Sequence, residues 1–319
     1  MRLLITGASG FVGQTLCQQA LTQCFNVRGV LRKHGNLPQG IQTVNVGEIH
    51  GSTDWTAALQ DVDIVIHLAA RVHLMNDKSL DPLAEYRKVN VQGTENLAIQ
   101  AALAGVKRLV FVSSIKVNGE TTSVDNKFTD AAPPAPQDPY SISKYEAEKI
   151  LHRTAEKTGI EIVILRLPLV YGPGVKGNFL QMLKILNKGI PLPFASVSNL
   201  RSLLYVDNLV DALLVCATHQ AASGQTYHVS DGQDISTPDL LRQLGKAMGR
   251  PARLFTCPPA LLKLAGHLIG KSSQIERLLG SFRVDSGKIK IELNWRPPCS
   301  LGEGLLKTGA WFQNIGTVK

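Results

Sequence analysis

Short segments rich in β-branched and apolar residues alternate with longer helical patterns through the first half of the chain. This alternation favours βαβ units, in which the strands run parallel and helices cover the sheet. The chain should therefore form a doubly wound α/β sheet, with a ligand crevice beyond the carboxyl ends of its strands. The predicted strands are 3–6, 26–31, 62–68, 108–113 and 161–165, and the predicted helices are 12–23, 81–104 and 141–158.

The charge of the chain limits its partners. Its 34 Lys and Arg residues exceed its 25 Asp and Glu residues, which gives a net charge of +9. Such an excess suits nucleic acid, an anionic membrane surface or an acidic small ligand. Because the sequence has no run of like charges and no basic stripe, we predict no nucleic-acid partner and favour a polyanionic small substrate.

Neither a metal site nor a membrane span is expected. The five cysteines are scattered without metal-ligand spacing, as expected of free thiols in a cytoplasmic protein. The apolar stretch 260–270 is interrupted by Lys263 and His267 and is far shorter than the roughly 20 residues of a spanning helix. Met1 to Ile5 leads straight into glycines instead of forming a secretory leader, which also favours a cytoplasmic location.

A glycine-rich turn, Gly7 to Gly13, follows the first predicted strand and opens a helical pattern. Glycines permit a tight bend and let the backbone approach a pyrophosphate, which the free N–H groups of a helix N-terminus bind. The GxxGxxG spacing in this strand–turn–helix context predicts dinucleotide binding. The predicted contacts of this turn are Gly7, Gly10, Phe11, Val12 and Gly13.

The end of the second predicted strand bears on the choice of cofactor. Leu31 stands where a carboxylate would bond the adenosine ribose of NAD, and Arg32 follows it. The planar guanidinium of an arginine can pair with a 2′-phosphate, which favours NADP(H). If Arg32 instead stacks on adenine or lies in solvent, the cofactor is NAD(H).

Tyr140 and Lys144 lie four residues apart at the start of a helical pattern, so their side chains share one face. A tyrosine has an ordinary pKa of roughly 10, and an adjacent cation favours its phenolate. We therefore expect Lys144 to lower the pKa of Tyr140 toward the range of efficient proton transfer. Ser114 supplies a hydroxyl at the end of the fourth predicted strand, while Ser113 should point away.

Together the glycine turn, Ser114 and the Tyr140/Lys144 pair resemble those of the extended short-chain dehydrogenases/reductases, and the match covers nearly the whole chain. The resemblance implies that Ser114 holds the reacting oxygen, that Tyr140 exchanges the proton and that Lys144 binds the nicotinamide ribose. Further cofactor contacts implied by the resemblance are Glu48, Ile49, Leu68, Ala69, Ala70, Asn90 and Pro168.

The pattern loosens after Val170, where segments rich in proline and glycine, such as 188–193, exclude regular structure. We expect a Rossmann domain over residues 1–170, to which 201–232 returns. A smaller α+β substrate-binding domain is expected over residues 171–319.

Three further segments, 165–174, 201–207 and 284–297, narrow the resemblance to the epimerase/dehydratase enzymes of nucleotide sugars. The implied substrate is a UDP-sugar, contacted by Ser114 and Asn178 and, at its diphosphate, by Arg201. Arginine suits that position because it is permanently charged and bidentate. Family members often dimerise through two helices each, so we also expect a homodimer, formed through 81–104 and 140–158.

Two departures from the pattern of 4-epimerases affect the predicted reaction. Leu169 stands where many of them have asparagine, and Asn118 where they have tyrosine. Leu169 and Arg32 favour NAD(P)H-dependent reduction over epimerisation. The segments 169–173 and 282–285 resemble those of bacterial polysaccharide reductases, which implies a UDP-4-keto-6-deoxy-N-acetylhexosamine as substrate, for polysaccharide or O-antigen precursors. One alternative is a UDP-hexose 4-epimerase with retained NAD. Another is a catalytically silent NADP sensor, which the intact Ser/Tyr/Lys set disfavours.

Overall fold

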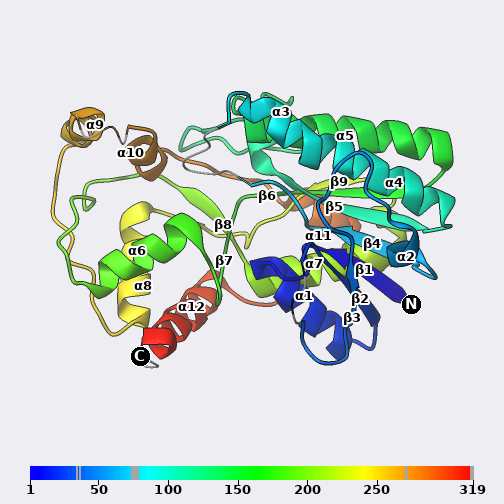
Figure 1. Ribbon diagram of the computed structural model, residues 1–319. Helices are drawn as coiled ribbons and strands as arrows, with labels where there is room; N and C mark the ends of the chain where they lie inside the picture. Colours follow the sequence, from blue (N-terminus) through cyan, green and yellow to red (C-terminus); the bar gives the residue numbers. More distant parts are fainter. Residues whose placement is uncertain (34, 36, 73–78, 269, 271, 317–319) are drawn as a thin grey trace.

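The computed structural model describes residues 1–319 except 34, 36, 73–78, 269, 271 and 317–319 (Figure 1). Its main sheet has seven parallel strands in the order β3-β2-β1-β4-β5-β6-β9, which confirms the predicted doubly wound class. The strands are β1 (Arg2–Thr6), β2 (Asn26–Leu31), β3 (Gln42–Asn45), β4 (Ile64–His67), β5 (Arg108–Ser114), β6 (Glu161–Leu167) and β9 (Thr226–His228).

Alternate residues of the inner strand β1 enter different cores. Leu3 and Ile5 pack on one side of the sheet and Leu4 on the other, and all three are fully buried. This burial on both faces explains why the strand is continuously apolar. Helices α4 and α5 cover one face and α1 and α7 the other (Figure 1). These helices are α1 (Phe11–Thr22), α4 (Gly93–Leu103), α5 (Pro139–Thr158) and α7 (Val206–Thr218), and shorter ones are α2 (Thr56–Leu59), α3 (Pro82–Arg87) and α11 (Gly287–Glu292).

A second lobe is built around a small mixed sheet with the order β10-β8-β7. Its strands are β7 (Leu169–Tyr171), β8 (Arg201–Tyr205) and β10 (Asp234–Ile235). Their apolar side chains share a core with the surrounding helices. These helices are α6 (Gly177–Asn187), α8 (Thr237–Ala247), α9 (Pro259–Leu268), α10 (Ser272–Leu279) and α12 (Leu301–Gly316).

Asp231 connects the two lobes. Just beyond β9, its carboxylate accepts hydrogen bonds from the backbone N–H of Tyr205 on β8 at 2.8 Å and from the hydroxyl of Tyr171 on β7 at 3.1 Å. It also accepts one from the Asn208 amide of α7 at 2.8 Å. The carboxylate is buried, so these bonds replace its hydration and fix the small sheet against the end of the main one.

The helix predicted over 81–104 is not regular. A π-helical turn, η1 (Lys88–Gln92), separates α3 from α4. Such a turn contains one extra residue, and it often occurs at a functional site. Apolar periodicity cannot reveal one inserted residue, so the prediction was wrong in this detail. Within the described part of the chain, no helix is both long and apolar enough to cross a bilayer.

Helix α1 lies unusually close to the turn that precedes it. A Cβ on Gly13 would lie 2.2 Å from the carbonyl oxygen of Gly7 and 2.8 Å from the Cα of Ala8. Both atoms belong to the backbone and cannot rotate away. Glycine at position 13 therefore allows the helix N-terminus to sit directly at the end of β1.

We expect Gly13→Ala to lower the free energy of unfolding by about 1–3 kcal/mol, the usual cost of overpacking, and to weaken dinucleotide binding. Urea unfolding and a dinucleotide titration measure the two effects. Gly302→Ala in α12 is the matched control, because its added Cβ meets nothing within 4 Å. That control should be neutral or slightly stabilising. Equal unfolding free energies for the two variants would contradict the close packing at Gly13.

Candidate functional site

The candidate site lies where the strand order of the main sheet changes direction, between the neighbouring strands β1 and β4. The loops that follow these two strands are in contact. Gly7 has a φ of +70°, and a Cβ on it would lie 3.0 Å from the backbone nitrogen of Ala69. The hydroxyl of Thr6 accepts a hydrogen bond from that same nitrogen at 3.1 Å. The glycine turn and the Leu68–Ala70 segment thus form one surface.

The N-terminus of α1 fits a pyrophosphate. Gly10 is its N-cap residue, and no side chain caps the first turn. The backbone N–H of Gly10 itself bonds to the carbonyl oxygen of Gly7 at 2.9 Å, which closes the turn. The N-cap glycine places no side chain over the N–H groups of the first helical turn, and such free N–H groups are what bind phosphate groups at helix N-termini.

The other predicted cofactor residues line the same edge of the sheet or lie just behind it. Arg32 immediately follows β2, and Glu48 lies three residues after β3. Phe11, Val12, Leu68, Ala69 and Ala70 are partly buried, Gly13, Ile49 and Pro168 are buried, and Arg32 and Glu48 are exposed.

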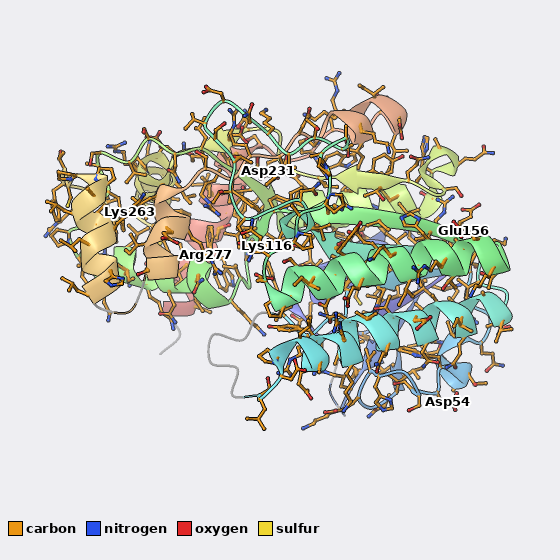
Figure 2. The ribbon with its side chains drawn as sticks, turned by 90° about the horizontal axis from the view of Figure 1, so that it is seen from above. Asp54, Lys116, Glu156, Asp231, Lys263 and Arg277 are labelled. Atoms are coloured by element: carbon orange, nitrogen blue, oxygen red, sulfur yellow. The ribbon has the colours of Figure 1, made fainter. Side chains whose placement is uncertain are left out.

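Ser114 and Tyr140 are held by two short connections. Ser114 ends β5, and its Oγ accepts a hydrogen bond from the backbone N–H of Lys116 at 3.2 Å. The ammonium of Lys116 pairs with Asp138 at 2.5 Å and with Glu120 at 2.8 Å. Asp138 is the N-cap of α5, two residues before Tyr140, and Figure 2 shows Lys116 near that end of the helix. This ion pair joins the end of β5 to the start of the helix that carries Tyr140.

Asp138 caps α5 through a capping box with Ser141, whose backbone N–H donates to its carboxylate at 2.6 Å. Burial alone would raise the pKa of Asp138, but hydrogen bonds from Lys116 and Ser141 and the charge of Lys116 lower it to about 2. The cap therefore stays ionised, which also suits the positive end of the helix dipole.

The expected lowering of the pKa of Tyr140 does not occur in the chain alone. Burial raises the pKa of its phenol, and Asp138 and Tyr86 add to the increase. The Tyr86 ring packs edge-on against the Tyr140 ring, with centroids 6.0 Å apart. The prediction considered the charge of Lys144 but not the low-polarity surroundings, which favour the neutral phenol.

Lys144 is almost fully buried one turn further along α5. Its Nζ lies 3.8 Å from the centroid of the Phe111 ring, on β5, in a cation–π contact. Burial lowers the pKa of Lys144 to about 7, although the charge of Glu148 opposes the shift. The side chain of Lys144 can therefore change between its charged and neutral forms near neutral pH.

Asn90 lies in the π-helical turn and is buried. Its Nδ2 donates to the Oγ of Ser143 on α5 and to the carbonyl oxygen of Arg71, both at 3.0 Å. Its Oδ1 accepts from the backbone N–H of Arg71 at 2.8 Å. One amide thus joins the loop after β4 to the helix of Tyr140 and Lys144.

A buried ion pair lies one turn beyond Lys144. Arg166 on β6 donates to Glu148 on α5 through its Nη2 at 2.6 Å and its Nε at 3.1 Å. Ser113 on β5 donates to the same carboxylate at 2.5 Å, and Asn118 accepts from Arg166 at 3.1 Å. Every charged group is hydrogen-bonded, as burial requires.

His67, at the end of β4, is buried between two hydroxyl groups. The Thr6 hydroxyl lies 2.7 Å from Nδ1 and the Thr94 hydroxyl 3.0 Å from Nε2, so a neutral ring donates to one hydroxyl and accepts from the other. Burial, followed by the charge of Lys144, lowers the pKa of His67 to about 3. The imidazole is therefore neutral near Lys144.

Of the predicted substrate residues, Ser114 lies at the end of β5, whereas Asn178 and Arg201 lie in the second lobe. Asn178 is exposed in the first turn of α6, and Leu169, the first residue of β7, is 46% exposed. The guanidinium of Arg201 donates to the carbonyl oxygens of Arg277 at 2.6 Å and Gly280 at 3.2 Å. Arg201 therefore binds the backbone carbonyl groups at the C-terminal end of α10.

Comparison with known proteins identifies the family of this chain. Residues 3–230 match the NAD dependent epimerase/dehydratase family. The chain is 44% identical to a UDP-glucose 4-epimerase of Vibrio cholerae over 312 residues, which cover 97% of this chain and 95% of the relative. The chain belongs to the NAD dependent epimerase/dehydratase family.

Solved structures of related folds agree. UDP-glucose 4-epimerase of Thermotoga maritima, solved with UDP-glucose, superposes with a TM-score of 0.80 at 24% identity and full coverage of both chains. UDP-glucuronic acid 4-epimerase of Bacillus cereus, solved with UDP-glucuronic acid and NAD, gives a TM-score of 0.80 at 24% identity, covering 99% of this chain and 100% of that one. These likenesses confirm the fold.

As a member of this family, the chain is an NAD-dependent enzyme of nucleotide sugars. This confirms the predicted class of enzyme. Sequence reasoning missed His67, Glu148 and Lys116, although two signals were present. His67 directly precedes the predicted Leu68–Ala70 contacts. Glu148 follows Tyr140 and Lys144 at the same four-residue spacing. Lys116 carried no such signal, because its partner Asp138 is distant in the sequence.

The neutral state of His67 gives this family member an acid sensitivity. Unfolded histidine takes up a proton below about pH 6.5, whereas folded His67 stays neutral down to about pH 3, so acid favours the unfolded state. When the pH falls from about 7 to about 5, the free energy of unfolding should decrease in both proteins. We expect the decrease to be about 2 kcal/mol smaller for His67→Gln than for the unchanged chain.

Urea unfolding at the two pH values measures the difference. The exposed His152 of α5 supplies a control, since His152→Gln should lose as much stability in acid as the unchanged chain. An identical acid loss in His67→Gln and the unchanged chain would show that folded His67 takes up its proton normally.

Proposed function

We propose that this chain is a UDP-hexose 4-epimerase that retains its NAD. The observation that carries the proposal is the 44% identity to a UDP-glucose 4-epimerase over 97% of the chain. It favours the alternative reading of the sequence over 4-keto reduction, which depended mainly on Leu169 and Arg32. The Ser114, Tyr140 and Lys144 set serves either reaction, so the two differ in net consumption of cofactor.

The glycine turn, the uncapped N-terminus of α1 and the Leu68–Ala70 segment would hold the dinucleotide. Bound NAD would supply a hydride acceptor and donor at the sugar carbon. Arg32 and Glu48, exposed beyond β2 and β3, would face the adenosine end. Asn90 and Lys144 would contact the nicotinamide ribose, since Asn90 fixes the loop after β4 against α5.

Tyr140 would accept the proton of the sugar 4-hydroxyl and return it after the keto sugar has turned. Ser114 would hold that oxygen by a hydrogen bond from its hydroxyl. Burial raises the pKa of Tyr140, so proton removal needs a nearby positive charge when substrate is present. Lys144, whose pKa of about 7 allows it to be charged near neutral pH, would supply it from the next turn.

The substrate diphosphate would lie toward the second lobe, near Asn178 and Arg201. Arg201 could serve there only by sharing its guanidinium with the carbonyl oxygens at the end of α10. The partly exposed Leu169 offers no polar contact to the sugar. Action in the cytoplasm on O-antigen or other polysaccharide precursors and a homodimer built on α4 and α5 are parts of the same proposal. The exposed Ile99 and Leu103 of α4 support the dimer.

Stoichiometry separates the candidate reactions. Purified protein given UDP-glucose or UDP-N-acetylglucosamine, without added cofactor, should form the 4-epimer, because retained NAD is regenerated in each cycle. Nuclear magnetic resonance of the sugar anomeric protons measures the product. If UDP-4-keto-6-deoxy-N-acetylglucosamine instead consumes NAD(P)H and no epimer forms, the chain is a reductase. Absence of both reactions would favour the silent sensor.

Tyr140→Phe should leave NAD binding nearly intact and lower turnover by a factor on the order of 10² to 10⁴, the usual contribution of a positioned acid/base. Tyr145 offers a matched control, because Tyr145 and Lys149 have the same four-residue spacing on α5. Lys149 is exposed whereas Lys144 is buried, so Tyr145→Phe should keep full turnover. Retention of a tenth of turnover by Tyr140→Phe would remove Tyr140 from the proposed role.

A further inference from the structure

The net positive charge of this chain comes from two stretches that lack carboxylates. Residues 162–206 and 240–275 contain 11 Lys and Arg residues and not one Asp or Glu. The remainder of the chain has 23 Lys and Arg against all 25 Asp and Glu, so its net charge is −2. These stretches contribute β7, β8, α6, α9 and most of α8 to the second lobe. The whole excess of +9 therefore comes from segments that build mainly this lobe.

Helix α9 lies at the outer end of that lobe, away from α4 and α5 (Figure 1; Figure 2 labels its Lys263). Its inner face is closely packed. Leu262 is buried in the core of the lobe, and a Cβ on Gly266 would lie 2.8 Å from Ile275 of α10. The helix is thus anchored by α10 and does not stand free.

The opposite face of α9 is apolar and exposed. Leu261, Leu264 and Leu268 are 55%, 56% and 76% exposed. Their i, i+3, i+7 spacing places them on one stripe, which faces away from Leu262 and Gly266. A helix that is apolar on both its inner and its outer face is normally covered on both.

Two further exposed apolar side chains lie on the segments before α9 and after α6. The segment leading into α9 runs beside the one after α6, with the backbone N–H of Phe255 donating to Leu192 at 3.0 Å. Phe255 is 50% exposed and Ile190 is 46% exposed. We call the exposed side chains of Ile190, Phe255, Leu261, Leu264 and Leu268 the α9 surface.

We propose that the α9 surface docks this protein on an anionic phospholipid surface. Apolar side chains on an interfacial helix enter the boundary between headgroups and acyl chains, while basic residues around them attract anionic lipids. Lys263 and His267 border the leucine stripe, and Arg253 lies two residues before Phe255. Residues 240–275, which include α9, contain no Asp or Glu that would repel anionic lipid headgroups.

Charge also decides among possible occupants. A second copy would bring one basic lobe against another, which long-range repulsion opposes. Single-stranded nucleic acid favours aromatic side chains on which bases stack, whereas this surface consists mainly of leucine and isoleucine. An anionic bilayer supplies both a negative surface and an apolar interior.

Flotation of the full-length protein with lipid vesicles tests the proposal. At low salt, we expect binding to vesicles of equal parts phosphatidylcholine and phosphatidylglycerol, and little binding to phosphatidylcholine alone. The double variant Leu264→Gln/Leu268→Gln should weaken binding on the order of tenfold, because two apolar side chains no longer enter the bilayer. High salt should also weaken it.

Ile291→Gln is the matched control, since Ile291 is 83% exposed on α11 in the main lobe. It should bind the mixed vesicles as the unchanged chain does. Circular dichroism checks that every variant is folded. No binding to anionic vesicles, equal binding to neutral ones, or equal loss in the control would overturn the proposal. So would size-exclusion data in which the double variant abolishes self-association of the unchanged chain.

Discussion

The buried pair of Glu148 and Arg166 is the interaction on which the placement of helix α5 depends. It fixes α5 to β6, and Ser113 adds β5 through the same carboxylate. Asn118 extends the network to the backbone at Ala132, in the loop that leads to α5. Loss of one partner would leave the other charge buried and unpaired, a defect that costs about 3–5 kcal/mol. The positions of Tyr140 and Lys144 relative to Ser114 therefore depend on a buried contact one turn beyond Lys144.

The protonation states of the ionisable groups near that network are set mainly by burial. Four ionisable groups lie at the carboxyl ends of β4 and β5, yet burial keeps Tyr140 and His67 neutral and leaves Lys144 close to its titration point. Asp138 stays charged because Lys116 and Ser141 bond it. The unliganded site therefore avoids several unpaired buried charges, which would be costly. A charged ligand would redistribute protons among these groups when it binds.

The sequence predicted the sheet well, because buried parallel strands are continuously apolar and the helices between them are periodic. It predicted less well where function depends on a single inserted residue or on distant partners. Asn90 was named as a candidate, but its π-helical turn was not foreseen. The Tyr145/Lys149 pair repeats the spacing of Tyr140/Lys144, and only burial separates the two. Burial is also why the pKa of Tyr140 moved in the opposite direction to the prediction.

The π-helical turn has a consequence for how this helix tolerates changes in length. In a regular α-helix, one extra residue would offset everything on its far side by about 100°, whereas a π-helical turn takes up that residue by widening locally. Deleting Lys88 would remove the widened turn and leave α3 and α4 in register. Asn90 would then lose the position from which it bonds Ser143 and the loop after β4. This short segment is thus a length-sensitive spacer in which a deletion acts like a distant point mutation.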